Sequence, residues 1–248
     1  MSTHIVIPDT QVKPGVPIDH LAWAGRYIRE QFGGQPDVTV VHLGDHWDMP
    51  SLSSYDKGKR AMADRSYAED VAAGNLALHL LTTSLRRKSW TPRLVLLRGN
   101  HEDRITRAEG DASIPPGTVS MTHLESPGWE VYGYQVPVDI DGIWYSHMWY
   151  NPANGRPYSG MVETRLKQVG HSFSQGHQQG LQYALRPVGR TRHHGLVAGS
   201  FYQHEERYMG PQAMAYWRGI VVCHEVREGT YDPMFVSLGY LKRRYASA

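Results

Sequence analysis

The chain has 248 residues, 40% of them hydrophobic, and its 26 basic and 24 acidic side chains leave a formal net charge of +2. This length fits one α/β domain with a large core, and we predict a single domain over residues 1–248. The small net charge excludes recognition of nucleic acid by the overall field alone. The single cysteine, Cys223, excludes an internal disulfide and a cysteine-based zinc site.

The sequence carries no signal for export or membrane insertion. Residues 1–10 lack the basic start and long apolar core of a signal peptide, and no apolar run approaches the length of a membrane span. We therefore expect a cytoplasmic protein without a membrane partner. Histidine is the outlier of the composition, with 14 residues. Because imidazole is a common metal ligand, this count favours a metal site.

The first half of the chain alternates strand and helix patterns. Short apolar runs predict strands over 4–8, 40–43 and 93–97, and apolar residues at helical spacing predict helices over 18–31 and 67–85. This alternation is typical of parallel βαβ units, in which ligands bind at the carboxyl ends of the strands. The second helix is expected to bury Ala68, Val71, Ala72, Leu76, Leu80 and Leu81.

The rest of the chain reads differently. The polar, basic stretch 49–64 and the stretch 110–128 are predicted as loops, and 160–169 as a helix. A second half rich in strands predicts another sheet packed on the first. The predicted strands lie at 129–134, 136–140, 143–147, 172–177, 181–188, 194–199, 219–226 and 234–238.

Polar residues with metal-ligating side chains follow several of these strands. Each group alone is an ordinary turn, but together they bring carboxylate, amide and imidazole groups to one edge of a sheet. Such a mixture suits Mn, Fe or Zn. The groups are Asp9-x-Gln11, Gly44-Asp45-x-x-Asp48, Gly99-Asn100-His101-Glu102, Ser146-His147 and Gly176-His177-Gln178-Gln179.

In this order the groups resemble the motifs of the calcineurin-like metallophosphoesterase superfamily, D-x-H, G-D-x-x-D, G-N-H-E/D, a lone H and G-H-x-H. They span Asp9 to Gln179, roughly two thirds of the chain, and Gly199-Ser200 fits the pair that often follows. The resemblance implies a four-layer αββα sandwich of two mixed sheets flanked by helices, with metals at the carboxyl ends of the strands. The stretch 53–59 is similar to phage and prophage members, which implies the host cytoplasm.

The resemblance also implies two divalent ions bridged by Asp45. The second site would hold its ion with Asn100, His147 and His177, and the first site with Asp9, Gln11 and Gln179. Both glutamines replace histidines of the family motifs, and both replacements fall on the first site. Because only oxygen ligands remain there, we expect Mn, with Mg, Fe, Zn or Ni as alternatives.

Two divalent ions can hold a phosphoryl oxygen, generate the attacking hydroxide and stabilise the developing charge. The leaving alkoxide needs a proton, and in the family the histidine at the position of His101 acts as the general acid. His101 follows the ligand Asn100, so it can face the substrate without coordinating. Asp48 is predicted to orient His101. The alternative is that His101 only begins the following helix.

The candidate substrate contacts are basic. Arg104, Lys57, Lys59 and Arg60 can meet phosphates near the metals, or they can be solvated surface charges. The predicted function is a phosphodiesterase acting on nucleic acid or a nucleotide. The alternatives are a phosphomonoesterase, acting on protein or a small molecule, and a metal-stabilised binding module without catalysis. The sequence does not indicate the oligomeric state.

Other side chains near these motifs leave alternatives open. Gly170-His171 competes with Gly176-His177 as the ligand motif, and His46 or His204 can replace the missing imidazoles. Trp47 and Trp149 lie beside proposed ligands, where an aromatic ring can stack on a base or wall off the site.

Overall fold

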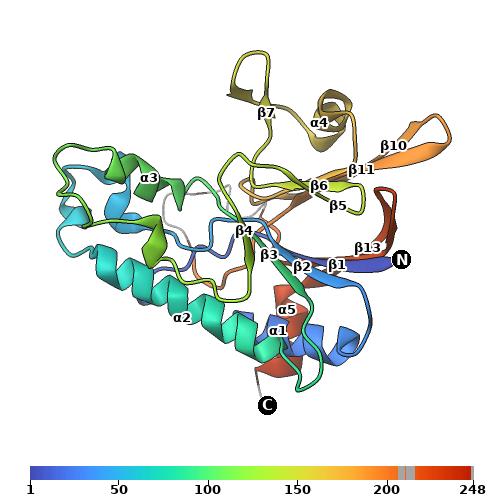
Figure 1. The fold of residues 1–248 in the computed structure, drawn as a ribbon, viewed down its shortest axis with the longest axis horizontal. Coiled ribbons are helices and arrows are strands. Elements are labelled where there is room, and N and C mark those ends of the chain that lie inside the picture. The colour runs from blue at the N-terminus through green and yellow to red at the C-terminus, as the bar shows by residue number, and fades with distance from the viewer. Residues whose placement is uncertain (206–209, 211–215, 247–248) are drawn as a thin grey trace.

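The computed structural model of the protein describes residues 1–205, 210 and 216–246. Two large β-sheets lie one above the other, with helices on their outer sides (Figure 1). The predicted α/β class with two mixed sheets flanked by helices is therefore confirmed. Within the described ranges, none of the helices combines the length and the apolar character needed to cross a bilayer.

The first sheet has six strands in the order β13-β12-β1-β2-β3-β4. Strands β1 to β4 run parallel, β12 pairs antiparallel with β1, and β13 pairs antiparallel with β12. The parallel βαβ units predicted from the first half are confirmed. The strands are β1 (Ser2–Ile7), β2 (Val38–His42), β3 (Arg93–Leu97), β4 (Glu130–Tyr132), β12 (Gly219–Arg227) and β13 (Thr230–Ser237).

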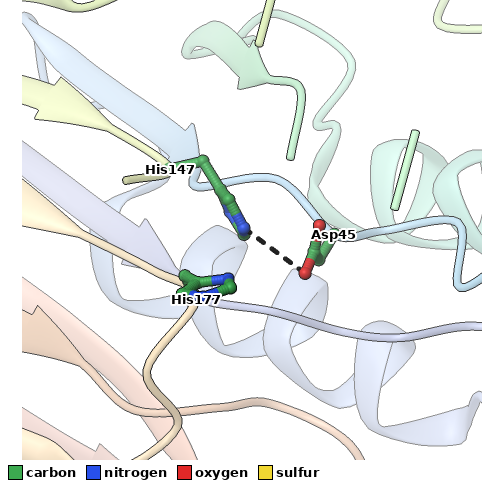
Figure 2. A group of neighbouring side chains, drawn as sticks. All are labelled: Asp45, His147 and His177. Carbon is green, nitrogen blue, oxygen red and sulfur yellow. Dashed lines mark ion pairs between the residues drawn. The ribbon is translucent and has the colours of Figure 1, made fainter. Parts of the chain in front are cut away.

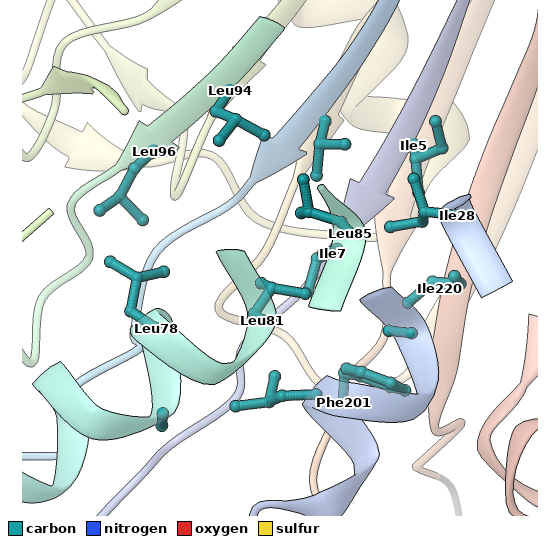
Figure 3. Packing of buried hydrophobic residues seen from close by; sticks show 14 of the residues in the cluster. Ile5, Ile7, Ile28, Leu78, Leu81, Leu85, Leu94, Leu96, Phe201 and Ile220 are labelled. Atoms are coloured by element: carbon teal, nitrogen blue, oxygen red, sulfur yellow. The ribbon is translucent and has the colours of Figure 1, made fainter. Parts of the chain in front are cut away.

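The central strands β1, β2 and β3 are mainly apolar because both of their faces are buried, and His4, Thr39 and His42 are buried polar exceptions. Ile5 and Ile7 of β1 pack against helices, whereas Val6 between them packs toward the second sheet. Figure 3 shows the helix side of this core, where leucines of β3 meet leucines of a helix. The helices on this side are α1 (Asp19–Phe32), α2 (Tyr67–Leu85) and α5 (Leu238–Tyr245).

Helix α2 has the predicted bounds but only part of the predicted buried face: Leu81 is buried and Val71 packs against the core as expected, whereas Ala68 and Ala72 are exposed. Leu76, expected inside, is 60% exposed, and the buried side is formed by Gly74, Ala77, Leu78, Leu81 and Leu85. A glycine contact explains the rotation, because a Cβ on Gly74 would lie 1.9 Å from the Trp47 ring. The helix turns its glycine toward this large buried side chain.

The second sheet has five strands in the order β10-β11-β9-β6-β5, and helix α4 (Val162–Val169) packs on its outer face. A second sheet is confirmed, but β4, β12 and β13 belong to the first sheet instead. A hairpin of β7 (Tyr150–Asn151) and β8 (Arg156–Pro157) stands apart. The strands are β5 (Val138–Ile140), β6 (Ile143–Ser146), β9 (Phe173–Gln175), β10 (Leu181–Val188) and β11 (Thr191–Ala198).

The remaining segments are short. Helix α5 was not predicted: the strand expected over 234–238 ends at Ser237, whose hydroxyl accepts the Tyr240 N–H and begins the helix at Leu238. Helix α3 (Asp103–Glu109) follows β3. The predicted loops contain only single 3₁₀ turns, at Pro50–Leu52, Ser54–Asp56, Arg60–Met62 and Met121–His123.

Candidate metal centre

The carboxyl ends of strands from both sheets meet at one edge of the molecule. Asp45 follows β2 of the first sheet, while His147 and His177 follow β6 and β9 of the second. Figure 2 shows these three side chains pointing toward one another, and one ligand atom from each lies within 4.8 Å of the others. This spacing allows all three to bind one metal ion.

The ring nitrogens of His147 show that the donor atoms of this cluster suit a cation. Nδ1 lies 2.8 Å from the carbonyl oxygen of Leu43 and donates to it. In a neutral ring Nε2 then carries a lone pair, and it faces two oxygens, Asp45 Oδ2 at 3.3 Å and Asn100 Oδ1 at 3.0 Å. Lone pairs this close need a cation between them, either a proton or a metal ion.

The pKa values of this pair show how a proton would take the place between the two groups. Burial alone would lower the pKa of His147, but the charge of Asp45 raises it to about 10. Burial would likewise raise the value for Asp45, yet His101 and His147 hold its pKa well below the usual carboxyl range. His177 completes the group, with Nδ1 at 2.7 Å from Asn100 Oδ1. The four predicted ligands of the second site are thus brought together.

The predicted first site contains buried oxygens without a donor. Asp9 Oδ1 accepts the His177 N–H at 3.0 Å, but Asp9 Oδ2 and Gln11 Oε1 have no hydrogen-bond partner among the described residues. Burial raises the pKa of Asp9 to about 7. Because unpartnered buried oxygens are costly, these two atoms fit a bound cation.

Gln179 lies at the same edge and has a partner. Its Oε1 accepts the hydroxyl of Tyr202. A carbonyl oxygen has two lone pairs, so one remains available to a cation. Gln11 and Gln179 line one cleft together with Asp45 and His177. The oxygen-only donor set expected for the first site is therefore compatible with this placement.

The backbone is strained where it presents these side chains. Gln11, Asp45, Met49 and His177 all have left-handed φ angles, of 40°, 48°, 49° and 64°. Outside glycine this conformation costs roughly 1–2 kcal/mol for each residue. Three of these four are predicted ligands, whereas the other five left-handed residues outside glycine that the structure describes, Asp37, Gln135, Asp141, Glu225 and Glu228, are not predicted site residues.

Two glycines of the motifs, Gly99 and Gly176, are needed because a carboxylate lies close to their backbone, and not because they form a special turn. A Cβ on Gly99 would lie 2.0 Å from Asp45 Oδ1, and a Cβ on Gly176 would lie 2.4 Å from Asp9 Oδ1. Any larger residue would push a carboxylate out of place. This explains why glycine precedes Asn100 and His177 in the sequence motifs.

Glu102 is a residue of the centre that the sequence analysis left without a role. Its buried carboxylate accepts four backbone N–H groups, from Gly99 at 2.7 Å, Asp45 at 3.1 Å, His46 at 2.6 Å and Trp47 at 2.9 Å. These bonds join the loop after β2 to the loop after β3. The only sequence signal for it was the acidic position that ends G-N-H-E.

We expect Glu102→Gln to destabilise the protein by about 2–4 kcal/mol. Whichever oxygen is replaced, two backbone N–H groups would face an amino group that cannot accept. Urea unfolding measures the loss, and Glu125→Gln, on an exposed loop, is the matched control. Equal unfolding midpoints for both variants would contradict the assigned role.

The predicted pair of His101 and Asp48 is in contact. His101 Nδ1 lies 2.7 Å from Asp48 Oδ1, and His101 Nε2 lies 3.7 Å from Asp45 Oδ2. Burial opposes its charge, but Asp45 and Asp48 raise the pKa of His101. Burial also opposes the charge of Asp48, but His101 and then Lys13, at 3.0 Å, lower the pKa of Asp48 to about 2. Lys13 was not anticipated.

A cleft of about 800 Å³ opens in front of His101. Arg104 lines it and donates to the carbonyl oxygens of Asp48 at 2.8 Å and Met49 at 3.2 Å. Lys59 also lines the cleft and pairs with Asp56 at 2.9 Å. Of the four basic residues expected to contact substrate, the other two, Lys57 and Arg60, are exposed and do not line this cleft.

Two of the alternative histidines have other roles. His46 uses both ring nitrogens, with Nδ1 2.7 Å from Thr10 Oγ1 and Nε2 2.9 Å from the Gly74 carbonyl oxygen, so neither is left for a metal. The ring of His171 lies 5.0 Å from that of Trp144 and 5.5 Å from that of Trp149. It belongs to this aromatic group rather than to the ligand cluster.

Three further rings near the centre, those of Trp47, Trp149 and His204, have contacts of their own. Trp47 is buried and its Nε1 donates to Asn75 at 3.1 Å, and Trp149 packs on Phe173. Both tryptophans are therefore packed rather than open to a base. His204 stacks on Tyr202 with ring centroids 4.6 Å apart, beside the residue that bonds Gln179.

No protein-family model matches the chain, and no curated protein matches its sequence. Function is therefore inferred from the geometry of this edge and from the motifs. At that edge the predicted ligands, the predicted acid and its carboxylate partner lie together.

Proposed function

We propose that the chain is a metal-dependent phosphodiesterase of the calcineurin-like metallophosphoesterase type, which acts on nucleic acid or a nucleotide. One observation carries the proposal. The carboxylate of Asp45 lies 3.3 Å from the ligand nitrogen of His147 and 3.7 Å from Nε2 of His101, which a second carboxylate fixes. A metal-ligand cluster and a held imidazole thus share one group, as metal-assisted ester hydrolysis requires.

We further propose that the fold is a four-layer αββα sandwich and that it binds two divalent ions. The buried clusters support a four-layer αββα sandwich, since one lies between helices and the first sheet, one between the sheets, and one under α4. Both ions would share Asp45, and when bound they would supply Lewis-acid polarisation of the phosphoryl group and activation of water. Manganese is the preferred ion. The sets are Asn100, His147 and His177 for one ion and Asp9, Gln11 and Gln179 for the other.

Side chains of the protein would hold the proton and transfer it to the leaving group. With Nδ1 in an ion pair with Asp48, protonated His101 would present Nε2–H toward the reacting group and pass that proton to the leaving alkoxide. Lys13 balances the charge of Asp48, so this carboxylate orients the ring without drawing the proton away. Arg104 ties down the backbone at Asp48 and keeps the pair in place. We place the activity in the cytoplasm, that of the host if the protein is phage-encoded.

A substrate panel with added manganese tests the proposed function. It contains a bis-aryl diester, an aryl monoester, single-stranded DNA, duplex DNA and cyclic nucleotides. We expect diester turnover that a chelator abolishes. Preferential hydrolysis of the monoester would indicate a phosphomonoesterase. Metal binding without any turnover would indicate a binding module.

The two glutamines lead to a prediction about metal preference. Neutral amide oxygens are weaker ligands than imidazole, so the purified protein should hold one ion firmly and lose the other on dialysis. Gln179→His should tighten the first site and shift its preference from Mn toward Zn. Calorimetry with Mn and with Zn measures both effects.

The matched control is Gln31→His, at an exposed position at the end of α1, which should leave both affinities unchanged. Two equally tight sites in the parent protein would contradict this prediction. So would an unchanged metal preference in Gln179→His, which would point to His204, beside Tyr202, as the residue that completes the site.

A further inference from the structure

The hairpin of β10 and β11 extends beyond the rest of the second sheet (Figure 1). Its base is packed, with Ala184 and His194 buried. Residues 185–192 are all exposed, although the strands stay paired to the turn, with Pro187 opposite Arg192 and Val188 opposite Thr191. We call residues 185–192 the free half of the hairpin. It is ordered structure with no described neighbour to cover it.

The free half carries only positive charge. Arg186, Arg190 and Arg192 lie within seven residues, and the sequence contains no Asp or Glu from 164 to 204. In the part of the chain that the structure describes, no acidic side chain forms an ion pair with any of these arginines. Three uncompensated guanidinium groups on one ribbon favour an anionic partner.

The three charges point in different directions. Side chains alternate along a strand, and Ala184 packs toward α4 whereas Tyr183 packs toward the first sheet. Arg186 therefore lies on the α4 side of the ribbon, and Arg192, which pairs opposite Pro187, lies on the other side. Arg190 lies at the turn. The ribbon is basic on both faces and at its tip.

This distribution of positive charge favours double-stranded nucleic acid as the anionic partner. A two-stranded ribbon enters the major groove of a duplex, where a phosphate backbone runs along each side. A single-strand binder would add aromatic rings for stacking, and a membrane-inserting hairpin would place large apolar groups at its tip. The free half has no aromatic residue, its tip is Gly189-Arg190, and its exposed apolar side chains, Leu185 and Val188, lie on opposite faces of the ribbon and form no apolar tip.

We propose that the free half of the hairpin is a contact surface for double-stranded nucleic acid, with Arg186, Arg190 and Arg192 on backbone phosphates. The hairpin begins two residues after Gln179, and its eight-residue strand β10 carries the tip roughly 26 Å from that starting point. The surface would hold a duplex without touching the reacting bond. That this duplex is the substrate rests on the proposed function, whereas the binding itself does not.

Fluorescence anisotropy with a duplex of about two helical turns tests the proposal, in a chelator that prevents cleavage. The hairpin variant combines Arg186→Gln, Arg190→Gln and Arg192→Gln. Three fewer phosphate contacts flatten the salt dependence, so between about 50 and 200 mM salt the parent should lose roughly fortyfold more affinity than this variant. A control variant with Lys88→Gln, Lys242→Gln and Arg243→Gln removes three exposed charges elsewhere and should behave like the parent.

Equal affinity and equal salt dependence in the parent and the hairpin variant would overturn the proposal. Hairpin-dependent binding to vesicles of phosphatidylcholine and phosphatidylserine, without duplex binding, would overturn it in favour of a membrane. Thermal unfolding confirms that the variants fold. Turnover of the bis-aryl diester reads the proposed function separately. It should be unchanged in the hairpin variant, and its absence in the parent would refute the enzyme while leaving the binding result intact.

Discussion

An Asp45→Asn variant should fold and yet lose most of its bound metal and about a thousandfold in turnover, which corresponds to about 4 kcal/mol. The carboxylate lies 3.3 Å from His147 Nε2 and is the one group proposed to serve both ions. The fold should survive for two reasons. Asparagine tolerates the left-handed backbone at this position, where φ is 48°, and its amide oxygen can still accept the His101 N–H that Asp45 Oδ1 accepts.

Metal analysis and turnover of the bis-aryl diester with manganese measure these losses. Asp37→Asn is the matched control, because Asp37 also has a left-handed φ, of 53°, but is exposed and lies at the opposite end of β2 from Asp45. It should keep full metal content and full activity. Full occupancy with normal turnover in Asp45→Asn would refute the bridging role.

His101→Ala should slow hydrolysis of natural diesters by roughly a hundredfold to ten-thousandfold while sparing nitrophenyl diesters. A nitrophenolate leaves without help, whereas a sugar alkoxide needs a proton. His101 is the imidazole that Asp48 fixes at 2.7 Å in front of the cleft. The defect should therefore grow with the basicity of the leaving group.

Rates on a series of leaving groups, taken at matched metal content, test this dependence. His79→Ala, on the exposed side of α2, is the control and should change neither rate. An equal loss on nitrophenyl and sugar diesters would mean that His101 acts through metal binding or structure instead.

The candidate ligand cluster was predictable because parallel strands bring the residues that follow them to the same edge of the sheet. Each apolar run of the first half is followed by a polar residue, and parallel strands deliver such residues to one edge. This rule alone predicts that Asp45 and Asn100 lie at the same edge. His147 and His177 needed the motif order as well, since they reach the edge from the second sheet.

Contacts between distant segments were beyond the reach of local patterns. Glu102 reads as an acid before a helix, and nothing local indicates that four N–H groups from two loops converge on it. The rotation of α2 depends on the Trp47 ring against Gly74. Strand β12 has an ordinary strand pattern, but its pairing with β1 joins opposite ends of the described chain.

The bond from the His177 N–H to Asp9 Oδ1 closes a loop of 168 residues, and this span governs when the centre can exist. A growing chain that has reached Ser146 already contains Asp9, Asp45 and Asn100, but neither of the two imidazoles proposed as ligands, His147 and His177. Contacts of such long range form late and slow the folding of a domain. Tight metal binding should therefore be one of the last events of folding. The ion would bind to a domain that has already folded and would not direct the folding of a partly synthesised chain.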